Sequence, residues 1–394
     1  MHRDRESMIE LLRNAELYDP AHKGRTHLMI AGETIVSTGG SLPALPAALA
    51  AREHDLEGRR VIPGLIDGHV HLTGGGGEAG PETRVHPLHL SRLTTAGVTT
   101  AVGVLGTDDT VRTPAELVTV ARGLIAEGLS AYCYTGGYHM PPVTVTGSVR
   151  GDIVLIDLIV GVGELAISDH RSSQPTLDEL LRVAGDAHVG GLMAGKAGIV
   201  HLHVGDGPRG LELVRQALEG SELPAAVFYP THVNRRKALF EEALALSRSG
   251  CTVDITAFPV KEGDDAWPAA AALTRYLSAG LSPERVTVSS DGGGCLPSFD
   301  AEGRVVAMDV GRPAALADTL RELLGCGQPL ERVLPAFTTN PARLLRLPRK
   351  GRLVPGSDAD LVVLDENGAV RDVMARGRWH VREGRAVIRG TFET

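Results

Sequence analysis

Apolar runs alternate with amphipathic segments along residues 62–345. Residues 98–105 are rich in Val and Thr and predict a buried strand. A helix is predicted to follow, because Thr113 can cap it, Pro114 suits its first turn and Glu116 occupies the capping-box position. Further helices are predicted at 176–181, 234–249 and 312–324. Such alternation of strands and helices is typical of a parallel sheet.

The two ends of the chain have a different pattern. Residues 12–61 and 356–394 carry short β-like runs separated by Gly and Pro, and neither end is long enough to hold a core alone. We therefore expect residues 1–61 and 346–394 to combine into one small β-sandwich domain. Residues 62–345 would form the larger domain.

Two histidines, His69 and His71, follow an apolar run near the start of the larger domain. Residues spaced i, i+2 on a strand point to the same face, so both imidazoles can reach one metal ion. Imidazole is a ligand that suits zinc and related metals. By itself this spacing also fits two surface histidines.

Three more candidate ligands, His203, His232 and Asp291, each end an apolar run and precede loop residues. His232 lies 29 residues after His203, and Asp291 lies 59 residues after His232, which are about one and two strand–helix repeats. The spacing assigns the histidine pair to the first strand and the other ligands to the fifth, sixth and eighth. Ligands at strand ends converge on one face of a (β/α)8 TIM-type barrel. We therefore predict an α/β fold of this type with a metal site.

Composition narrows the class of protein further. The 394-residue chain has a net charge of −8 and no basic cluster, which argues against nucleic acid and anionic membranes. No apolar signal segment opens the sequence, and no uncharged run is long enough to cross a bilayer. Its four cysteines are scattered, which indicates a reducing compartment. We expect a cytoplasmic protein.

The ligand pattern His-x-His, His, His, Asp resembles the amidohydrolase superfamily. Sequence motifs that narrow the resemblance to the bacterial isoaspartyl dipeptidases lie at residues 74–81, 167–171, 231–235 and 390–394. The resemblance extends over nearly the whole chain. It implies a metal-dependent barrel flanked by a small β domain that both termini build.

One metal-ligand position departs from the family pattern. The two metals of the family are bridged by a carboxylated lysine, seven residues before the arginine of the Ser-Asp-His-Arg motif, and this chain has Glu164 there. The only lysine between His71 and His203 is Lys196, which we interpret as a loop residue. A carboxylate can offer one oxygen to each cation, so we predict that Glu164 bridges two zinc ions. The alternative is a salt-bridged Glu164 beside a single metal.

The resemblance also implies a mechanism. One zinc ion would bind His69, His71, Glu164 and Asp291, and the other would bind Glu164, His203 and His232. A hydroxide between the metals would attack the scissile amide, with Asp291 as general base and then general acid. Tyr138 matches the family's oxyanion donor, although plain packing is an equally good interpretation of this tyrosine.

Substrate contacts are implied in the same way. Glu78 matches the residue that pairs with the substrate ammonium, and Arg171 and Arg235 suit bidentate binding of carboxylates. Thr107 matches a further residue that contacts the substrate in the family. Gly75, Gly76 and Gly77 would leave backbone N–H groups open to a ligand, or form a mobile loop. Cys295 replaces a family serine and is a weaker hydrogen-bond donor.

We therefore expect an enzyme, a metal-dependent dipeptidase that hydrolyses β-aspartyl (isoaspartyl) dipeptides through a metal-bridging hydroxide. Its partner would be a small dipeptide substrate, without nucleic acid or membrane, and the chain would form a homo-oligomer of unspecified size. Two alternatives stay open. One is another amidohydrolase, acting on a cyclic amide as dihydroorotases and hydantoinases do, or on an N-acyl amino acid. The other is a metal-free scaffold of the same fold.

Overall fold

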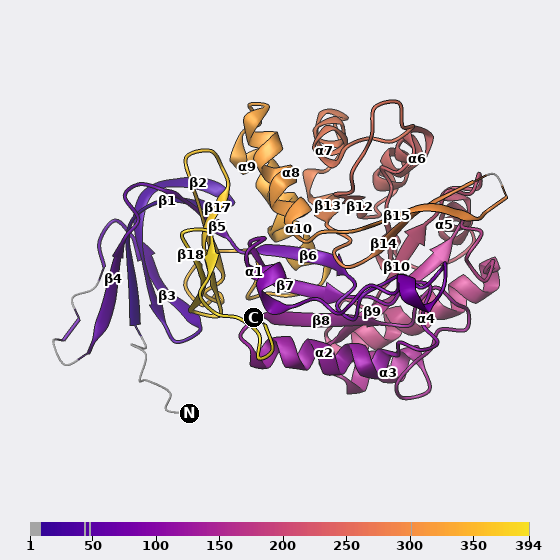
Figure 1. Cartoon of the computed structure of the whole chain (residues 1–394), viewed down its shortest axis with the longest axis horizontal. Coiled ribbons are helices and arrows are strands. Elements are labelled where there is room, and N and C mark those ends of the chain that lie inside the picture. The colour runs from indigo at the N-terminus through magenta and orange to yellow at the C-terminus, as the bar shows by residue number, and fades with distance from the viewer. Residues whose placement is uncertain (1–8, 43–44, 47–48, 301, 394) are drawn as a thin grey trace.

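The computed structural model describes residues 9–42, 45–46, 49–300 and 302–393. Two parts lie side by side along the longest axis (Figure 1). The left part holds a sheet built from the first and last strands of the chain, and the right part holds a parallel barrel and its helices. The opening residues, on which the expectation of no signal segment was based, lie outside the described residues, as does Thr394.

The larger part is built on parallel strands that follow one another in chain order. Strands β6 to β11 form one parallel sheet, and β12 pairs with β13 in parallel. A parallel bridge between Val70 and Gly292 joins the β13 end of this series to β6, so the strands curl into the TIM-type barrel that the alternating pattern predicts. The eight strands are β6 (Leu65–Val70), β7 (Val98–Gly103), β8 (Ser130–Thr135), β9 (Ile159–Ile167), β10 (Ile199–Val204), β11 (Phe228–Thr231), β12 (Val253–Thr256) and β13 (Val286–Ser289).

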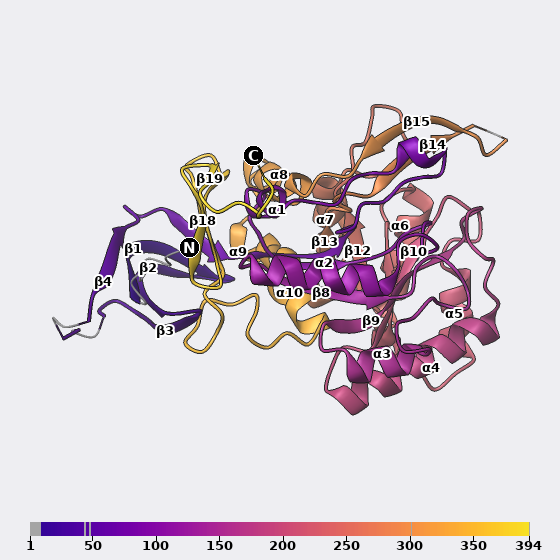
Figure 2. The same ribbon diagram turned by 60° about the horizontal axis from the view of Figure 1, so that its bottom comes forward.

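A helix follows each barrel strand in the chain, and the longer helices, such as α2 and α4, pack on the outside of the barrel (Figures 1 and 2). The predicted caps of two helices are confirmed: the Thr113 side chain accepts from Glu116, and Thr176 and Glu179 form a complete capping box. The eight helices are α1 (Leu90–Thr94), α2 (Pro114–Ala126), α3 (Val149–Leu155), α4 (Leu177–Ala194), α5 (Glu212–Glu219), α6 (Lys237–Arg248), α7 (Ala269–Ser278) and α8 (Ala314–Gly325). Two short helices, α9 (Leu330–Val333) and α10 (Thr339–Leu344), lead back to the terminal sheet.

The start of α6 differs from the prediction, which placed it at residue 234. The Asn234 amide donates to the carbonyls of Thr256 and Trp267 and accepts from the Thr256 N–H. This side chain therefore ties the loop after β11 to the end of β12, and the helix begins three residues later, at Lys237.

The terminal sheet combines strands that are far apart in the sequence. Strand β5 pairs with β1 on one side and with β16 on the other, which brings the two ends of the chain into a single nine-stranded sheet. An apolar cluster that includes Leu12, Ile30 and Val363 forms a core separate from the barrel core. The strands are β1 (Ile9–Asp19), β2 (Ala21–Ala31), β3 (Thr34–Gly39), β4 (Ala51–Asp55), β5 (Arg60–Pro63), β16 (Leu361–Leu364), β17 (Val370–Ala375), β18 (Arg378–Arg382) and β19 (Arg385–Ala386).

A last hairpin, β14 (Cys295–Phe299) with β15 (Val305–Val310), projects from the barrel beyond β13 (Figure 2). Within the described part of the chain, the helices are all too short or too polar to cross a membrane.

Candidate metal centre and active site

The predicted metal ligands lie together at the carboxyl ends of the barrel strands. His69 is in β6 with His71 directly after it, Glu164 is in β9 and His203 is in β10. His232 follows β11 directly, and Asp291 comes two residues after β13. The structure thus places the histidines and Asp291 at the first, fifth, sixth and eighth strands of the barrel, as the spacing predicts, and Glu164 on the fourth.

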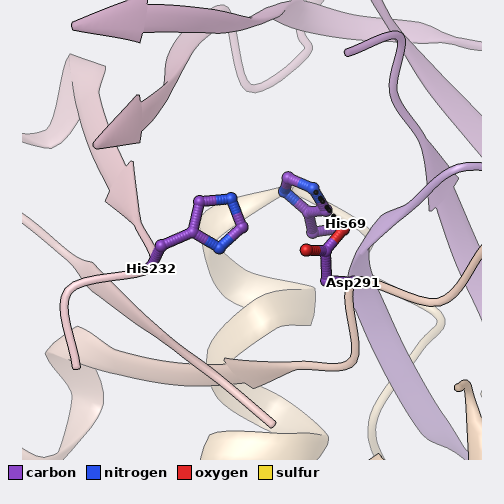
Figure 3. A group of neighbouring side chains, drawn as sticks. All are labelled: His69, His232 and Asp291. Carbon is purple, nitrogen blue, oxygen red and sulfur yellow. Dashed lines mark ion pairs between the residues drawn. The ribbon is translucent and has the colours of Figure 1, made fainter. Parts of the chain in front are cut away.

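Ligand atoms from these six residues lie close together inside the barrel. Three sets each have ligand atoms within 4.8 Å of one another: His69 with His71 and Glu164, Glu164 with His203 and His232, and His69 with His232 and Asp291. Figure 3 shows the third set, whose side chains approach from different barrel elements. Glu164 belongs to two of the sets, which is the position that a bridging carboxylate requires.

Two of these ligands have unusual backbone conformations. His232 has a φ of 61° and Asp291 a φ of 52°, a left-handed region that non-glycine residues seldom adopt. Such strain persists where the surrounding structure holds a side chain in a functional position.

The electrostatics of the cluster favour bound cations. Burial alone raises the pKa of the Glu164 carboxyl, but His69 and hydrogen bonds with His203 and His232 hold it well below its usual range. Burial lowers the pKa of His71, yet the neighbouring carboxylates of Asp291 and Glu164 outweigh it and raise the value to about 10. Without a metal, a protonated His71 therefore carries positive charge that balances these buried carboxylates.

Unpaired polar atoms provide a second indication of a metal site. His69 Nε2 and Asp291 Oδ1 are buried without a hydrogen-bond partner, 3.4 Å apart. Buried polar groups are normally satisfied, so an unpaired nitrogen and oxygen that face each other are suited to bind a common cation. The residues present therefore fit a metal centre. Lys196 takes no part in it, since its amine donates to the Ile153 and Ile156 carbonyls.

Three residues that the sequence did not single out contact the candidate metal ligands. Asp169 accepts from His203 Nε2 at 3.0 Å, the Thr256 hydroxyl lies 2.8 Å from His232 Nδ1, and His201 Nε2 lies 2.8 Å from His69 Nδ1. Partners of this kind fix which ring nitrogen of a histidine faces the metal. Asp169 was visible only as part of a family motif, because its contact with His203 depends on side-chain geometry.

A cavity of about 540 Å³ opens above the cluster. Glu78 and both predicted substrate arginines line it, as does Thr107. The Thr107 hydroxyl donates to Glu78 Oε1 at 3.0 Å, and Arg171 Nη1 lies 3.3 Å from the same oxygen, while Glu78 Oε2 is buried without a partner. Glu78 therefore keeps one oxygen free for a cationic group.

The predicted bidentate role of Arg171 needs correction. Its Nε and Nη2 atoms already bind both oxygens of Asp169, at 3.0 and 2.7 Å, so this edge of the guanidinium is occupied. Arg235 is less constrained: its Nη1 donates to the Val204 carbonyl at 3.1 Å, and its Nε lies 3.7 Å from Asp206.

The glycine prediction is also wrong in part. Gly75 and Gly76 line the cavity, but the Gly75 N–H donates to the Gly293 carbonyl at 2.8 Å and is not open to a ligand. Gly77 does not line the cavity. This loop is held in place by the segment after β13, a pairing that local sequence cannot reveal.

Tyr138 and Cys295 both line the cavity. The Tyr138 phenol lies 2.8 Å from His203 Nδ1, and burial raises its pKa well above the ordinary value, so it stays a hydrogen-bond donor. Burial likewise raises the pKa of the Cys295 thiol to about 12. A protonated thiol is a poor nucleophile, so Cys295 is not suited to attack a substrate.

The chain belongs to the amidohydrolase family, whose pattern matches residues 167–380. Among solved structures it is 43% identical to a β-aspartyl dipeptidase from Fervidobacterium islandicum AW-1 in complex with a β-Asp-Leu dipeptide. The alignment covers 97% of this chain and 98% of that chain, with a TM-score of 0.92.

More distant relatives share the fold. A D-hydantoinase from Thermus sp. is 18% identical, covers 97% of each chain and has a TM-score of 0.66. Among curated sequences, imidazolonepropionase from Paracoccus denitrificans is 24% identical over 91% of this chain and 94% of the relative. These matches support the barrel but do not define a substrate.

Proposed function

We propose that this amidohydrolase hydrolyses β-aspartyl dipeptides. The observation that carries the proposal is the charge arrangement of the cavity: Glu78 and the guanidinium groups of Arg171 and Arg235 line it together with the ligand cluster. A β-aspartyl dipeptide carries one ammonium and two carboxylates, which this arrangement complements. The resemblance to a dipeptidase solved with β-Asp-Leu supports the same substrate class.

We propose that the centre holds two zinc ions bridged by Glu164. His69 and His71 would complete one site, and His203 and His232 the other, in keeping with the two ligand sets that contain Glu164. Asp291 would join the first site, because its Oδ1 lies 3.4 Å from His69 Nε2 and 3.2 Å from His71 Nε2. Zinc in such a centre supplies Lewis acidity and lowers the pKa of water toward neutrality. Glu164 takes the place of a carboxylated lysine, because Lys196, the only lysine between His71 and His203 in the sequence, is bonded elsewhere.

The chain's own residues move the proton and hold the developing charge. The neighbouring His69 and His71 outweigh the effect of burial and hold the pKa of Asp291 below its usual range, so this carboxylate is ionised and would accept the proton of the attacking water. It then returns that proton to the amine as the amide bond breaks. The Tyr138 phenol is the donor for the carbonyl oxygen; a His203 nitrogen engaged as a ligand can no longer accept from it, which frees the phenol for this role.

Substrate orientation follows from the cavity lining. Glu78 Oε2, buried without a partner, would accept from the α-ammonium. Arg235, together with the remaining Nη1 of Arg171, would bind the carboxylates. Cys295, close to Glu78, would contact the same end of the substrate.

The test of this proposal is a substrate panel. We would compare kcat/KM for β-Asp-Leu, α-Asp-Leu, a hydantoin, a dihydropyrimidine and an N-acyl amino acid under the same metal loading. The proposal requires β-Asp-Leu to be cleaved far faster than the others. Preferred hydrolysis of a cyclic amide or an N-acyl amino acid would replace it with one of the alternative amidohydrolase activities.

Metal content is a prediction that needs no substrate. Since Glu164 belongs to two of the three ligand sets, one with His69 and His71 and one with His203 and His232, the purified protein is expected to carry close to two zinc ions per chain by elemental analysis. Removal by a chelator should abolish activity, and added zinc should restore it. Fully active protein with one ion per chain would contradict a binuclear centre.

Substitutions of Arg235 and Arg171 are predicted to affect KM and kcat differently. Arg235→Met is expected to raise KM by well over tenfold with little effect on kcat, because an unpaired buried carboxylate costs about 3–5 kcal/mol. Arg171→Met should lower kcat as well, since Arg171 also binds Asp169, which orients His203. Steady-state kinetics measure both constants.

Arg215→Met is a suitable control, because Arg215 is an exposed residue paired with Glu242. It should leave both constants unchanged. A change in KM below tenfold for Arg235→Met would remove Arg235 from the binding site.

Three further parts of the proposal concern the whole protein. We propose that residues 1–61 and 346–394 form a small β-sandwich domain beside a catalytic domain of residues 62–345. We also propose that the enzyme works in the cytoplasm and assembles as a homo-oligomer. Limited proteolysis, fractionation and light scattering, respectively, would test these points.

A further inference from the structure

His201 is a buried histidine in the barrel that none of the steps above uses. It lies on β10 two residues before His203 and has no exposed surface. Its ring is stacked between the rings of Tyr134 and Tyr229, with centroids 4.9 and 4.6 Å away and interplanar angles of 21° and 29°. The aromatic rings therefore hold the imidazole in one plane.

The hydrogen bonds of His201 determine where its proton lies. Its Nδ1 is 3.1 Å from the Tyr229 carbonyl oxygen, and a carbonyl oxygen only accepts, so Nδ1 carries the hydrogen. In a neutral imidazole the other nitrogen then has a lone pair. That nitrogen, Nε2, lies 2.8 Å from His69 Nδ1 and accepts a hydrogen bond from it.

The hydrogen bond to His201 likewise determines which ring nitrogen of His69 carries the hydrogen. With its hydrogen on Nδ1, the lone pair of His69 is on Nε2. This nitrogen is buried without a hydrogen-bond partner and faces Asp291 Oδ1 at 3.4 Å and Glu164 Oε2 at 3.6 Å. The chain of bonds from the Tyr229 carbonyl through His201 thus presents the metal-binding nitrogen of His69 in the form that a metal requires.

We propose that His201 is a positioning residue for the metal centre, which selects the tautomer of His69 and fixes its ring by donating to Tyr229 and accepting from His69. The inference rests on the metal centre proposed above. It excludes a role as a further ligand, because the one lone pair of the His201 ring already faces His69.

A neutral histidine suits this position for an electrostatic reason. The barrel interior near His69 already contains two fully buried carboxyl groups, Asp67 and Asp254. A third carboxylate as the acceptor for His69 would add a buried charge. Histidine supplies the acceptor without that charge, and its ring fills the space between two tyrosines.

The experiment measures metal binding by metal-free protein, without substrate. Zinc affinity would be determined by competition with a chromophoric chelator for the wild type and for His201→Leu and His201→Gln. Leucine fills a similar volume but cannot accept from His69, whereas the glutamine amide can accept and donate. We expect His201→Leu to weaken binding of one zinc ion by about 10–100-fold, and His201→Gln to recover most of this loss.

A matched control is His380→Gln in β18. His380 is equally buried and neither ring nitrogen has a hydrogen-bond partner, so its replacement should leave zinc affinity unchanged. The Co²⁺-loaded proteins provide a second measurement: the visible spectrum of His201→Leu should shift relative to that of the wild type, while His201→Gln and His380→Gln should not shift.

Thermal unfolding of each metal-free variant would show that it folds. Unchanged zinc affinity in folded His201→Leu would overturn the inference, and so would equal losses in the leucine and glutamine variants, which would assign the effect to packing. Normal zinc binding without β-aspartyl hydrolysis would instead reject the proposed function and leave the role of His201 intact.

Discussion

Glu164→Gln is expected to lose the second zinc ion and most of the catalytic rate. The amide keeps the size of the side chain but removes the charge that faces His69, His71, His203 and His232. Breaking a buried charge pair by removing one partner costs about 3–5 kcal/mol, which corresponds to about 10²–10⁴-fold in metal affinity. Elemental analysis and chelator competition would measure the loss.

Reconstitution distinguishes Glu164 from a carboxylated lysine. A lysine bridge must react with carbon dioxide before it can bind metal, whereas Glu164 already has its carboxylate. Metal-depleted wild type should therefore regain full activity from zinc alone in buffer free of carbon dioxide. Glu164→Lys should stay poorly active even with bicarbonate, because the longer side chain would place its carbamate beyond the other ligands. A bicarbonate requirement in the wild type, or two retained metals in Glu164→Gln, would mean that another residue forms the bridge.

Asp291→Asn is expected to lower kcat by at least about 10²–10⁴-fold, the usual contribution of a general acid–base group. Asparagine keeps an oxygen toward His69 and His71 but cannot accept the proton of the attacking water. The measurement is kcat at matched zinc content, so that weaker metal binding does not account for the loss.

Asp152→Asn is the matched control for this variant. Asp152 is equally buried but accepts from Thr135 and from the backbone of Val145 and Thr146, outside the cavity. Its replacement should lower the unfolding temperature and leave kcat unchanged. A metal-loaded Asp291→Asn that kept more than a tenth of the wild-type kcat would exclude Asp291 as the proton carrier.

The metal cluster could be predicted from sequence because it depends on a simple rule. Successive barrel strands end on the same face, so residue spacing alone brings His69, His232 and Asp291 together although more than 200 residues separate the first from the last. The strand assignment needs only the period of the apolar pattern, and that period is regular here.

The contacts that the sequence could not predict depend on side-chain rotamers and loop paths. Nothing in the Ser-Asp-His-Arg motif says that Asp169 binds both His203 and Arg171. The Gly75 amide is bonded to Gly293, more than 200 residues away in the sequence. Asn234 has good spacing for a helix start, but its side chain serves as a tether to Trp267 and Thr256. In each case the partner lies far away in the sequence, so the local sequence pattern does not predict the contact.

The pairing of β5 with both β1 and β16 has a consequence for the order of folding. Strand β16 begins at residue 361, so during synthesis the terminal sheet cannot be completed until almost the entire chain has left the ribosome. Closing so long a loop from an unfolded chain carries a large entropic cost. A barrel that folds first brings residues 63 and 361 close together and removes much of that cost. Deletions at either end should therefore unfold the sheet while sparing the barrel.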